Sequence, residues 1–229
     1  MITRRSLLTE ARFRELGGNV SSRQGADPTT TDFTGIVAQI APDVDSVFYG
    51  GVTSSGGGIF QKQLRQAGNT AQFLGPDGIA NGSGDAVGSQ INIAGVQAAA
   101  GTIASVAAIG DYAGKADFDA AYAEHFKDAP DFQTAGAYSG PAHACASVII
   151  QSLAAVLEAN PDADLATIRE GIRAWATNPS HTFDTVLGQE SFDEFGDTNL
   201  KFISFYVVDP SAAAGAGDWV YKEQKQFGG

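Results

Sequence analysis

Residues 47–81 read VFYGGVTSSGGGIFQKQLRQAGNTAQFLGPDGIAN, and this segment predicts two strands with a helix between them. A short apolar run at 47–49 ends in a glycine pair, and apolar side chains then recur at helical spacing through residues 59–67. A second apolar run at 72–74 leads into the turn Gly-Pro-Asp-Gly at 75–78, which carries a carboxylate at its apex. If the two strands are parallel neighbours, the loops that follow them lie at one edge of the sheet, where small ligands bind in open α/β sheets.

The residues that follow these two strands are therefore the candidate ligand contacts. Asp77 is the acidic residue that its neighbours place at a strand-end turn, although a Pro-Asp-Gly turn also favours aspartate for its backbone hydrogen bond alone. The loop after the first strand adds small and polar residues, namely Gly51, Val52, Thr53 and Ser54. A plain connection between strand and helix explains this loop about as well as ligand contact does.

Composition and charge restrict the class of protein. The chain has 229 residues, 43% of them hydrophobic, which is enough for a core in one large or two small domains. Its 14 basic and 26 acidic residues give a formal net charge of −12, which argues against a nucleic-acid partner because that affinity comes from clustered Lys and Arg. Strand and helix alternate up to about residue 110, which indicates a parallel α/β layer, and the later elements suit a second subdomain.

Patterns typical of catalysis or metal binding are not found. Gly51 and Gly56 have the spacing of a phosphate-binding loop, but Gly57 and Gly58 stand where that loop needs Lys and Ser or Thr. No serine lies in a Gly-x-Ser-x-Gly elbow. His125, His143 and His181 are far apart in sequence and lack metal-ligand spacing. The acidic run at 193–197 lacks the alternating ligands of an EF-hand. We therefore expect no catalytic residue, no metal ion and no cofactor.

Further elements are expected on either side of the central segment. Residues 19–22 predict a short strand, and Asp32 is placed to cap a helix over 33–40. Residues 99–109 predict a strand, which makes the uncharged run 91–110 a buried segment rather than a membrane span.

The later part of the chain predicts mainly helices. Residues 138–158 predict a long helix in which Cys145 is expected to be a small buried residue, and His125 is expected to pack on the apolar face of the helix before it. Asp164 is placed to cap another helix. Its apolar side chains are expected to face inward, namely Leu165, Ile168, Ile172 and Trp175. No targeting segment is visible at the start, where Glu10 interrupts the apolar run that a signal peptide needs.

Several segments share their order and spacing with one known family over nearly the whole chain. They include DSVFYGG at 45–51, LRQAG at 64–68, FLGPDG at 73–78 and SFDEFGD at 191–197. With Asp32-Phe33, Ala100-Gly101 and the helix that begins at Tyr138, they resemble the periplasmic leucine/isoleucine/valine-binding proteins, the substrate-binding components of branched-chain amino acid ABC transporters.

The resemblance implies an α/β fold of the periplasmic-binding-protein type I kind, with two lobes built on parallel sheets. Residues 1–108 and 200–229 would form the second lobe, and residues 109–199 the returning part of the first lobe. The first lobe would be incomplete, with the chain truncated at its N-terminus. Apolar surface on the helix over 138–157 would then be uncovered.

The resemblance also implies a binding protein that performs no catalysis. In the family the acidic residue of the Gly-Pro-acid-Gly turn binds the ligand ammonium, and Asp77 occupies that position, although many relatives have Glu. Val52 stands where leucine-binding relatives have Tyr. The part of the family fold with no counterpart here carries the groups that hold the ligand carboxylate.

The expected ligand is an amino acid held in an interlobe cleft, the expected partner is an ABC permease, and the expected location is the periplasm or the cell exterior. A ligand-sensing domain of a receptor with the same fold is the alternative within binding proteins. An α/β enzyme is the alternative from another class.

Overall fold

The computed structural model of the chain describes residues 4–129 and 135–227 and divides into two compact units. Unit 1 consists of Met1–Val106 and Phe205–Glu223, and unit 2 consists of Ala107–Ser204 and Gln224–Gly229. The boundaries between the units fall after residues 106, 204 and 223. The assignment of these units to the lobes of a complete binding protein stays a prediction.

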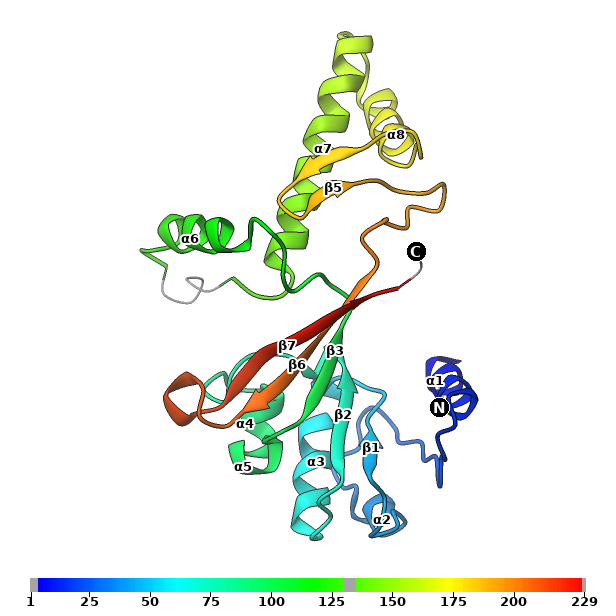
Figure 1. Ribbon diagram of the computed structural model, residues 1–229, viewed down its shortest axis with the longest axis vertical. Coiled ribbons are helices and arrows are strands. Elements are labelled where there is room, and N and C mark those ends of the chain that lie inside the picture. The colour runs from blue at the N-terminus through cyan, green and yellow to red at the C-terminus, as the bar shows by residue number, and fades with distance from the viewer. Residues whose placement is uncertain (1–3, 130–134, 228–229) are drawn as a thin grey trace. The chain divides into compact units, whose positions relative to one another are not determined.

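A five-stranded sheet with the order β1-β2-β3-β6-β7 supports unit 1 (Figure 1). The strands are β1 Ser46–Phe48, β2 Gln72–Pro76, β3 Ile103–Val106, β6 Phe202–Asp209 and β7 Asp218–Gln226. The first three are parallel, with Val47 opposite Phe73 and Gly75 opposite Ala104. β6 runs against β3, since Val208 bonds to the backbone of Thr102 whereas the earlier residue Ser204 donates to the later Ala108 carbonyl.

Short helices cover one face of this sheet (Figure 1). They are α2 Thr34–Val37, α3 Gly57–Gln66, α4 Gln90–Ala94 and α5 Val96–Ala99. Leu64 of α3 and Phe73 of β2 are fully buried in the resulting core, and each such side chain stabilises the fold by about 1.5–3 kcal/mol. Burial alternates along β2 and β3, so the covered face of the sheet is the one that carries Phe73 and Ala104.

Unit 2 is built around one long helix. Its elements are α6 Lys115–His125, α7 Ser139–Ala159, α8 Leu165–Ala176 and the antiparallel pair β4 Phe183–Thr185 and β5 Gly188–Glu190. α7 and α8 approach closely at Gly171, where an added Cβ would lie 2.9 Å from Val156. The Gln151 side chain joins α7 to β4 by donating to the Asp184 carbonyl at 2.9 Å.

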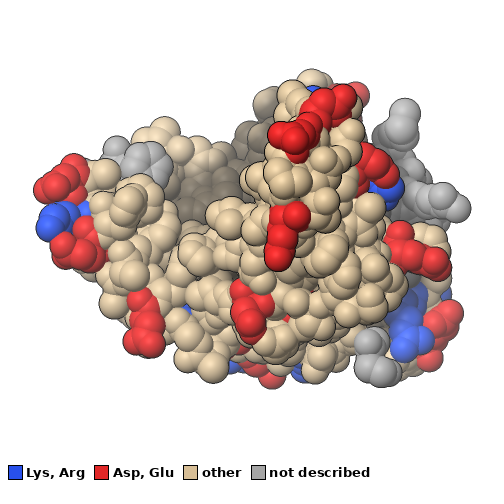
Figure 2. Space-filling model, turned by 90° about the horizontal axis from the view of Figure 1, so that it is seen from above, with Lys and Arg blue, Asp and Glu red and all other residues tan. Residues whose placement is uncertain are grey.

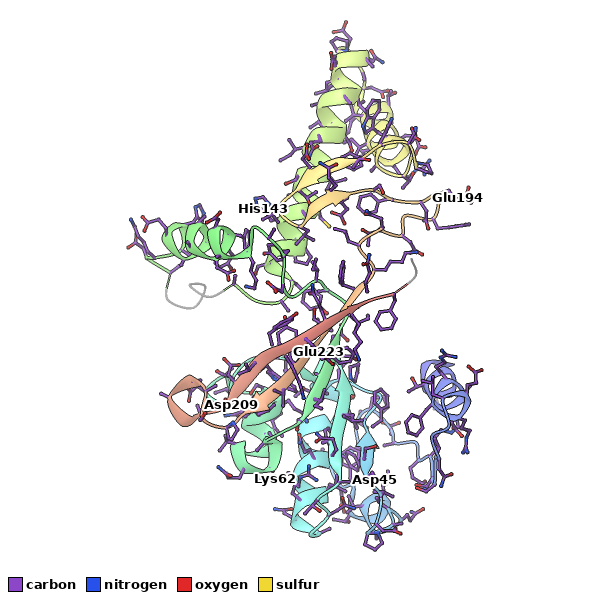
Figure 3. All side chains as sticks on the ribbon, in the orientation of Figure 1. Asp45, Lys62, His143, Glu194, Asp209 and Glu223 are labelled. Carbon is purple, nitrogen blue, oxygen red and sulfur yellow. The ribbon has the colours of Figure 1, made fainter. Side chains whose placement is uncertain are left out.

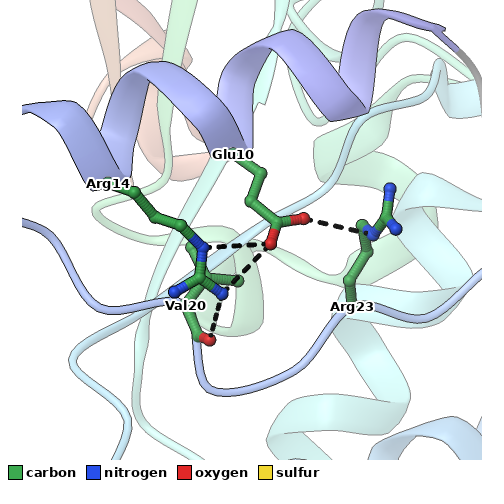
Figure 4. A network of polar contacts seen from close by, with 4 residues as sticks. All are labelled: Glu10, Arg14, Val20 and Arg23. Atoms are coloured by element: carbon green, nitrogen blue, oxygen red, sulfur yellow. Dashed lines mark hydrogen bonds and ion pairs between the residues drawn. The ribbon is translucent and has the colours of Figure 1, made fainter.

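The strand expected at 19–22 is wrong, because these residues form no strand. Val20 is the single apolar residue among polar neighbours, so the segment has no apolar side to bury. Its carbonyl instead accepts a hydrogen bond from Arg14 of α1 (Arg4–Glu15), within a network that Glu10 extends to Arg23 (Figure 4). Exposed ion pairs of this kind contribute about 0.2–1 kcal/mol each.

Two expected elements are shorter in the structure. The Asp32 carboxylate accepts a hydrogen bond from the Thr34 amide at 3.0 Å, but the capping position of α2 is Phe33 and the helix ends at Val37. The predicted strand at 99–109 is confined to β3, because the residues just before it form α5. The uncharged run at 91–110 thus contributes to α4, α5 and β3, and Ile91 is fully buried.

The expected burial of several side chains in unit 2 is also wrong. Cys145 is exposed, because the buried stripe of α7 follows Gly140, Ala144, Val148 and Ser152, and the next residue along a helix points about 100° away. On α8, Leu165 and Trp175 are exposed, and α6 buries none of its residues, including His125.

The expectation of an uncovered apolar face on the long helix is confirmed. Ile149 is 53% exposed and Ile150 is 65% exposed, both on the side of α7 opposite the buried stripe. Among the described residues, α7 is the one helix with the length and hydropathy of a membrane span. Core helices of soluble proteins commonly share that property.

Candidate functional site

The loops that follow β1 and β2 lie side by side at the carboxyl edge of the sheet. A Cβ added to Gly78 would lie 2.3 Å from Val52 Cγ1, so Val52 rests directly on the turn after β2. The hydroxyl of Thr53 is 3.3 Å from the Gly78 carbonyl oxygen. The expected adjacency of the two loops is confirmed, and it places the candidate contacts of both loops together.

Three of the candidate side chains reach solvent. Asp77 is exposed at the start of the short 3₁₀ turn Asp77–Ile79, and its Oδ1 accepts the Gly78 amide at 2.9 Å. Val52 is 44% exposed, and Ser54 is exposed in the turn Thr53–Ser55. A carboxylate, an apolar side chain and a hydroxyl are thus presented at one edge of the sheet.

Gly51 has a packing role that the sequence did not reveal. An added Cβ there would lie 2.8 Å from the Tyr49 ring and 2.9 Å from Ser55 Oγ. The Tyr49 hydroxyl donates to the Ser55 carbonyl at 2.6 Å, and burial raises the pKa of Tyr49, which keeps this donor protonated. Ser55 Oγ accepts the Val52 amide at 3.1 Å. Only glycine at position 51 leaves room for this arrangement.

Thr53 is turned into the protein and is 4% exposed. Its hydroxyl lies 2.8 Å from Asn81 Oδ1 and 3.2 Å from Gln90 Oε1. The sequence placed Thr53 beside the ligand, whereas its hydroxyl bonds to internal groups. The sequence analysis did not identify Asn81 or Gln90. The signal that could have found them was their position, since Asn81 ends the central segment and Gln90 directly follows the helix-capping Ser89.

Two further acidic residues, Asp45 and Asp209, lie at the edge of the sheet opposite Asp77. Asp45 immediately precedes β1, and Asp209 ends β6, which runs against β3 (Figure 3). Both acids therefore belong to the edge opposite Asp77. Asp45 is exposed, and its backbone carbonyl accepts the Gln72 amide. Asp45 is consequently a matched control for substitutions at Asp77.

The charge distribution fits a small ligand better than a polyanion. On the face shown in Figure 2, acidic side chains are scattered over the surface and few basic ones accompany them. Within residues 4–129 and 135–227 there is no group of three or more His, Cys, Asp or Glu that could hold a metal ion.

Comparison with known proteins shows that the chain is similar to curated amino-acid-binding proteins. No family model matches the chain. It is 29% identical over 198 residues to the leucine-, isoleucine-, valine-, threonine- and alanine-binding protein of Pseudomonas aeruginosa. It is 34% identical over 206 residues to the Leu/Ile/Val/Thr-binding protein of Salmonella typhimurium. The resemblance to the leucine/isoleucine/valine-binding proteins is confirmed. These alignments cover 85% and 88% of this chain but 46% and 48% of the relatives, so the chain spans about half their length.

Solved structures show the same fold. A leucine-binding protein from Thermotoga maritima matches 96% of this chain with 56% of its own, at a TM-score of 0.69 and 20% identity. The closed form of a leucine-, isoleucine-, valine-, threonine- and alanine-binding protein from Brucella ovis matches 96% of this chain with 54% of its own, at a TM-score of 0.70 and 19% identity. The chain therefore has part of the type I periplasmic-binding-protein fold, as expected from the sequence.

Proposed function

We propose that the chain is part of the substrate-binding component of an amino-acid ABC transporter, and that it binds ligand without catalysing a reaction. The observation that carries the proposal is the contact of Val52 with Gly78, which joins the loops after two parallel strands beside the exposed Asp77. The names of the curated relatives, which bind aliphatic amino acids and threonine, support the same class of ligand.

Each exposed residue of the site has a chemical role in this proposal. The Asp77 carboxylate pairs with the ligand ammonium, which needs a charged, hydrogen-bonding partner once it leaves water. Val52 contacts the aliphatic side chain of the ligand, and Ser54 offers a hydroxyl. Gly51 and Thr53 act on the ligand through the loop whose shape they fix.

The intact protein would work by closing two lobes over the ligand and presenting the closed form to a membrane permease. That mechanism places it in the periplasm or at the cell exterior. Specific recognition of an amino acid requires partners for both of its charged ends, and the site described above supplies one for the ammonium.

Titration of the isotopically labelled chain with leucine, followed by amide chemical shifts, tests the proposal. We expect shifts concentrated at residues 52–55 and 77–78, at millimolar leucine. Asp77→Asn should weaken the response at least tenfold, and Asp45→Asn should leave it unchanged. 4-Methylpentanoate, which is leucine without its amino group, should produce no such shifts. An equal response to both compounds would contradict the role of Asp77.

A further inference from the structure

A continuous hydrogen-bond network of side chains lies beneath the loop that carries Val52 and Thr53. Gln61 of α3 and Gln90 of α4 are both fully buried, and Gln90 Nε2 donates to Gln61 Oε1 at 2.8 Å. Gln61 Nε2 in turn lies 3.1 Å from the Ala98 carbonyl and 2.5 Å from Thr102 Oγ1. Two buried glutamines in succession are unusual in an apolar core, since each polar atom must find a partner.

The direction of the hydrogen bonds in this network is fixed by the Ala98 carbonyl, which can only accept a hydrogen bond. The Ala98 carbonyl requires the amide nitrogen of Gln61 to face it, so the Gln61 oxygen faces Gln90. Gln90 must therefore present its nitrogen to Gln61, which leaves its oxygen towards Thr53. The orientation of both amides follows from the backbone of α5.

Three acceptor oxygens consequently converge on one hydroxyl. Thr53 Oγ1 lies 2.8 Å from Asn81 Oδ1, 3.2 Å from Gln90 Oε1 and 3.3 Å from the Gly78 carbonyl. Asn81 Oδ1 also accepts the Gln90 backbone amide at 3.0 Å, which fixes that side chain as well. The hydroxyl carries one hydrogen, which these oxygens share, with Asn81 Oδ1 as the nearest acceptor. Thr53 thus links the loop after β1 to the loop after β2 and to the start of α4 at a single point.

We propose that Gln90 is a positioning residue of the candidate ligand site. Through its bond to Gln61 it directs its own oxygen to Thr53, and so it holds residues 52–55 against the turn that carries Asp77 before any ligand is present. The consequence for affinity rests on the proposed function, because a loop that is already ordered loses less conformational freedom when ligand binds. The coupling of the two loops does not depend on that function.

The coupling is tested without ligand by amide hydrogen exchange in Gln90→Met, which keeps the length of the side chain and removes its hydrogen bonds. The reporters are the amides of Ser55 and Gly56, which bond to the carbonyls of Val52 and Thr53. We expect their exchange to accelerate at least tenfold, while the Ala67 amide of α3 stays within twofold. Gln66→Met, at an exposed glutamine of α3, is the control. It should change exchange neither at Ser55 and Gly56 nor at Ala67. A uniform acceleration at all these amides would mean that Gln90 only stabilises the fold, and would overturn the proposal.

A second pair of variants addresses the case in which Gln90→Met does not fold. Thr53→Ser retains the hydroxyl and should exchange as the wild type does. Thr53→Val removes it and should accelerate exchange at Ser55 and Gly56. Equal exchange in both variants would overturn the proposal.

Gln90→Glu adds a pH-dependent readout, and exchange at Ser55 is compared with exchange at Ala67 to separate positioning from a loss of overall stability. A carboxylate cannot donate to Gln61 Oε1, whereas a protonated carboxyl can, and burial raises the pKa of such a group. Gln90 faces the uncharged residues Thr53, Gln61 and Asn81. It also faces Gly57, at which an added Cβ would lie 2.8 Å from Gln90 Oε1. The Tyr49 ring also flanks Gly57, and burial raises its pKa. The ratio of variant to wild-type exchange at Ser55 should be large at pH 8 and approach one at pH 5. A ratio independent of pH would contradict the proposed hydrogen bond from Gln90 to Gln61.

Leucine titration of the same variants separates this inference from the proposed function. If Gln90→Met loosens the loop and weakens leucine binding more than Gln66→Met does, both stand. If the loop loosens but the wild type shows no response to leucine, the positioning role stands and the proposed function fails. If the loop does not loosen, the positioning role fails whatever leucine does.

Discussion

Val52 rests on the backbone of Gly78 so closely that a single added carbon on Gly78 would lie 2.3 Å from Val52 Cγ1. This contact determines how the loops after β1 and β2 fit together. It also makes Gly78 a position at which size, rather than backbone conformation, is restricted.

Gly78→Ala should therefore destabilise unit 1 by about 1–3 kcal/mol, the usual cost of inserting a carbon into a packed site. Gly35→Ala is the matched control, since an added Cβ there has no atom within 4 Å and the position lies in α2. Urea unfolding of both variants measures the difference. The double variant Gly78→Ala with Val52→Ala should recover most of the loss, and full additivity of the two changes would show that the contact is not the cause.

The exposed apolar face of α7 should cause the isolated chain to self-associate. Ile150, 65% exposed, is the test position, and Ile150→Lys should shift the chain towards monomer in sedimentation velocity. Val87→Lys introduces the same charge in unit 1 at a residue that is 95% exposed, and should change nothing. A wild-type chain that is monomeric at 100 µM would show that this face does not drive association.

We expect the isolated chain to bind free amino acids only weakly, with a response at millimolar concentrations. A ligand carboxylate without donors forfeits about 1.5–3 kcal/mol for each charged hydrogen bond, so two missing bonds weaken binding by two or more powers of ten, at about 1.4 kcal/mol per decade. Calorimetric titration with leucine, isoleucine, valine and several polar amino acids measures this. Micromolar affinity would mean that the chain already holds both ends of the ligand.

Glu190 should make the stability of unit 2 depend on pH. Burial raises the pKa of this carboxyl, and the hydrogen bond from Thr198 Oγ1 at 3.0 Å opposes the rise only in part. Because the folded pKa is raised, the stability linked to its protonated form is present in acid and is lost as pH rises through that pKa.

Glu190→Gln keeps the acceptor for Thr198 and carries no charge. It should be more stable than the wild type at pH 7 and equal to it at pH 4 in urea unfolding. Exposed Glu194→Gln is the control. An advantage of Glu190→Gln that is the same at both pH values would show that ionisation is not the reason.

The spacing of apolar residues was sufficient to predict β1, α3 and β2 and the contact between the loops that follow the two strands. Phe60 and Leu64 at helical spacing, between two short apolar runs, predicted α3 between two parallel strands, and parallel pairing brought Asp77 next to Val52. The direction of the Thr53 side chain could not be predicted, because it depends on Gln90, which is distant in sequence and reaches Thr53 only after α4 has packed.

The wrong predictions of side-chain burial in unit 2 have one physical origin. An apolar residue on a helix indicates that some face is buried, but not which elements are present to cover it. Cys145 and Leu165 follow apolar periodicity, and yet no described element packs over them. The strand expected at 19–22 failed for the opposite reason, since Val20 alone supplies too little apolar surface to dock on a sheet.

The pairing of β3 with β6, in which the Gly101 amide donates to the Val208 carbonyl, also constrains the order in which the chain can fold. Most of unit 2 lies between these two residues in sequence. During synthesis, β3 must therefore wait with an unpaired edge until β6 has left the ribosome, whereas the helices of unit 2 can form in the meantime. Contacts between residues so distant in sequence form slowly, so completion of the sheet should be the late step, and a chaperone that shields strand edges would act during that interval.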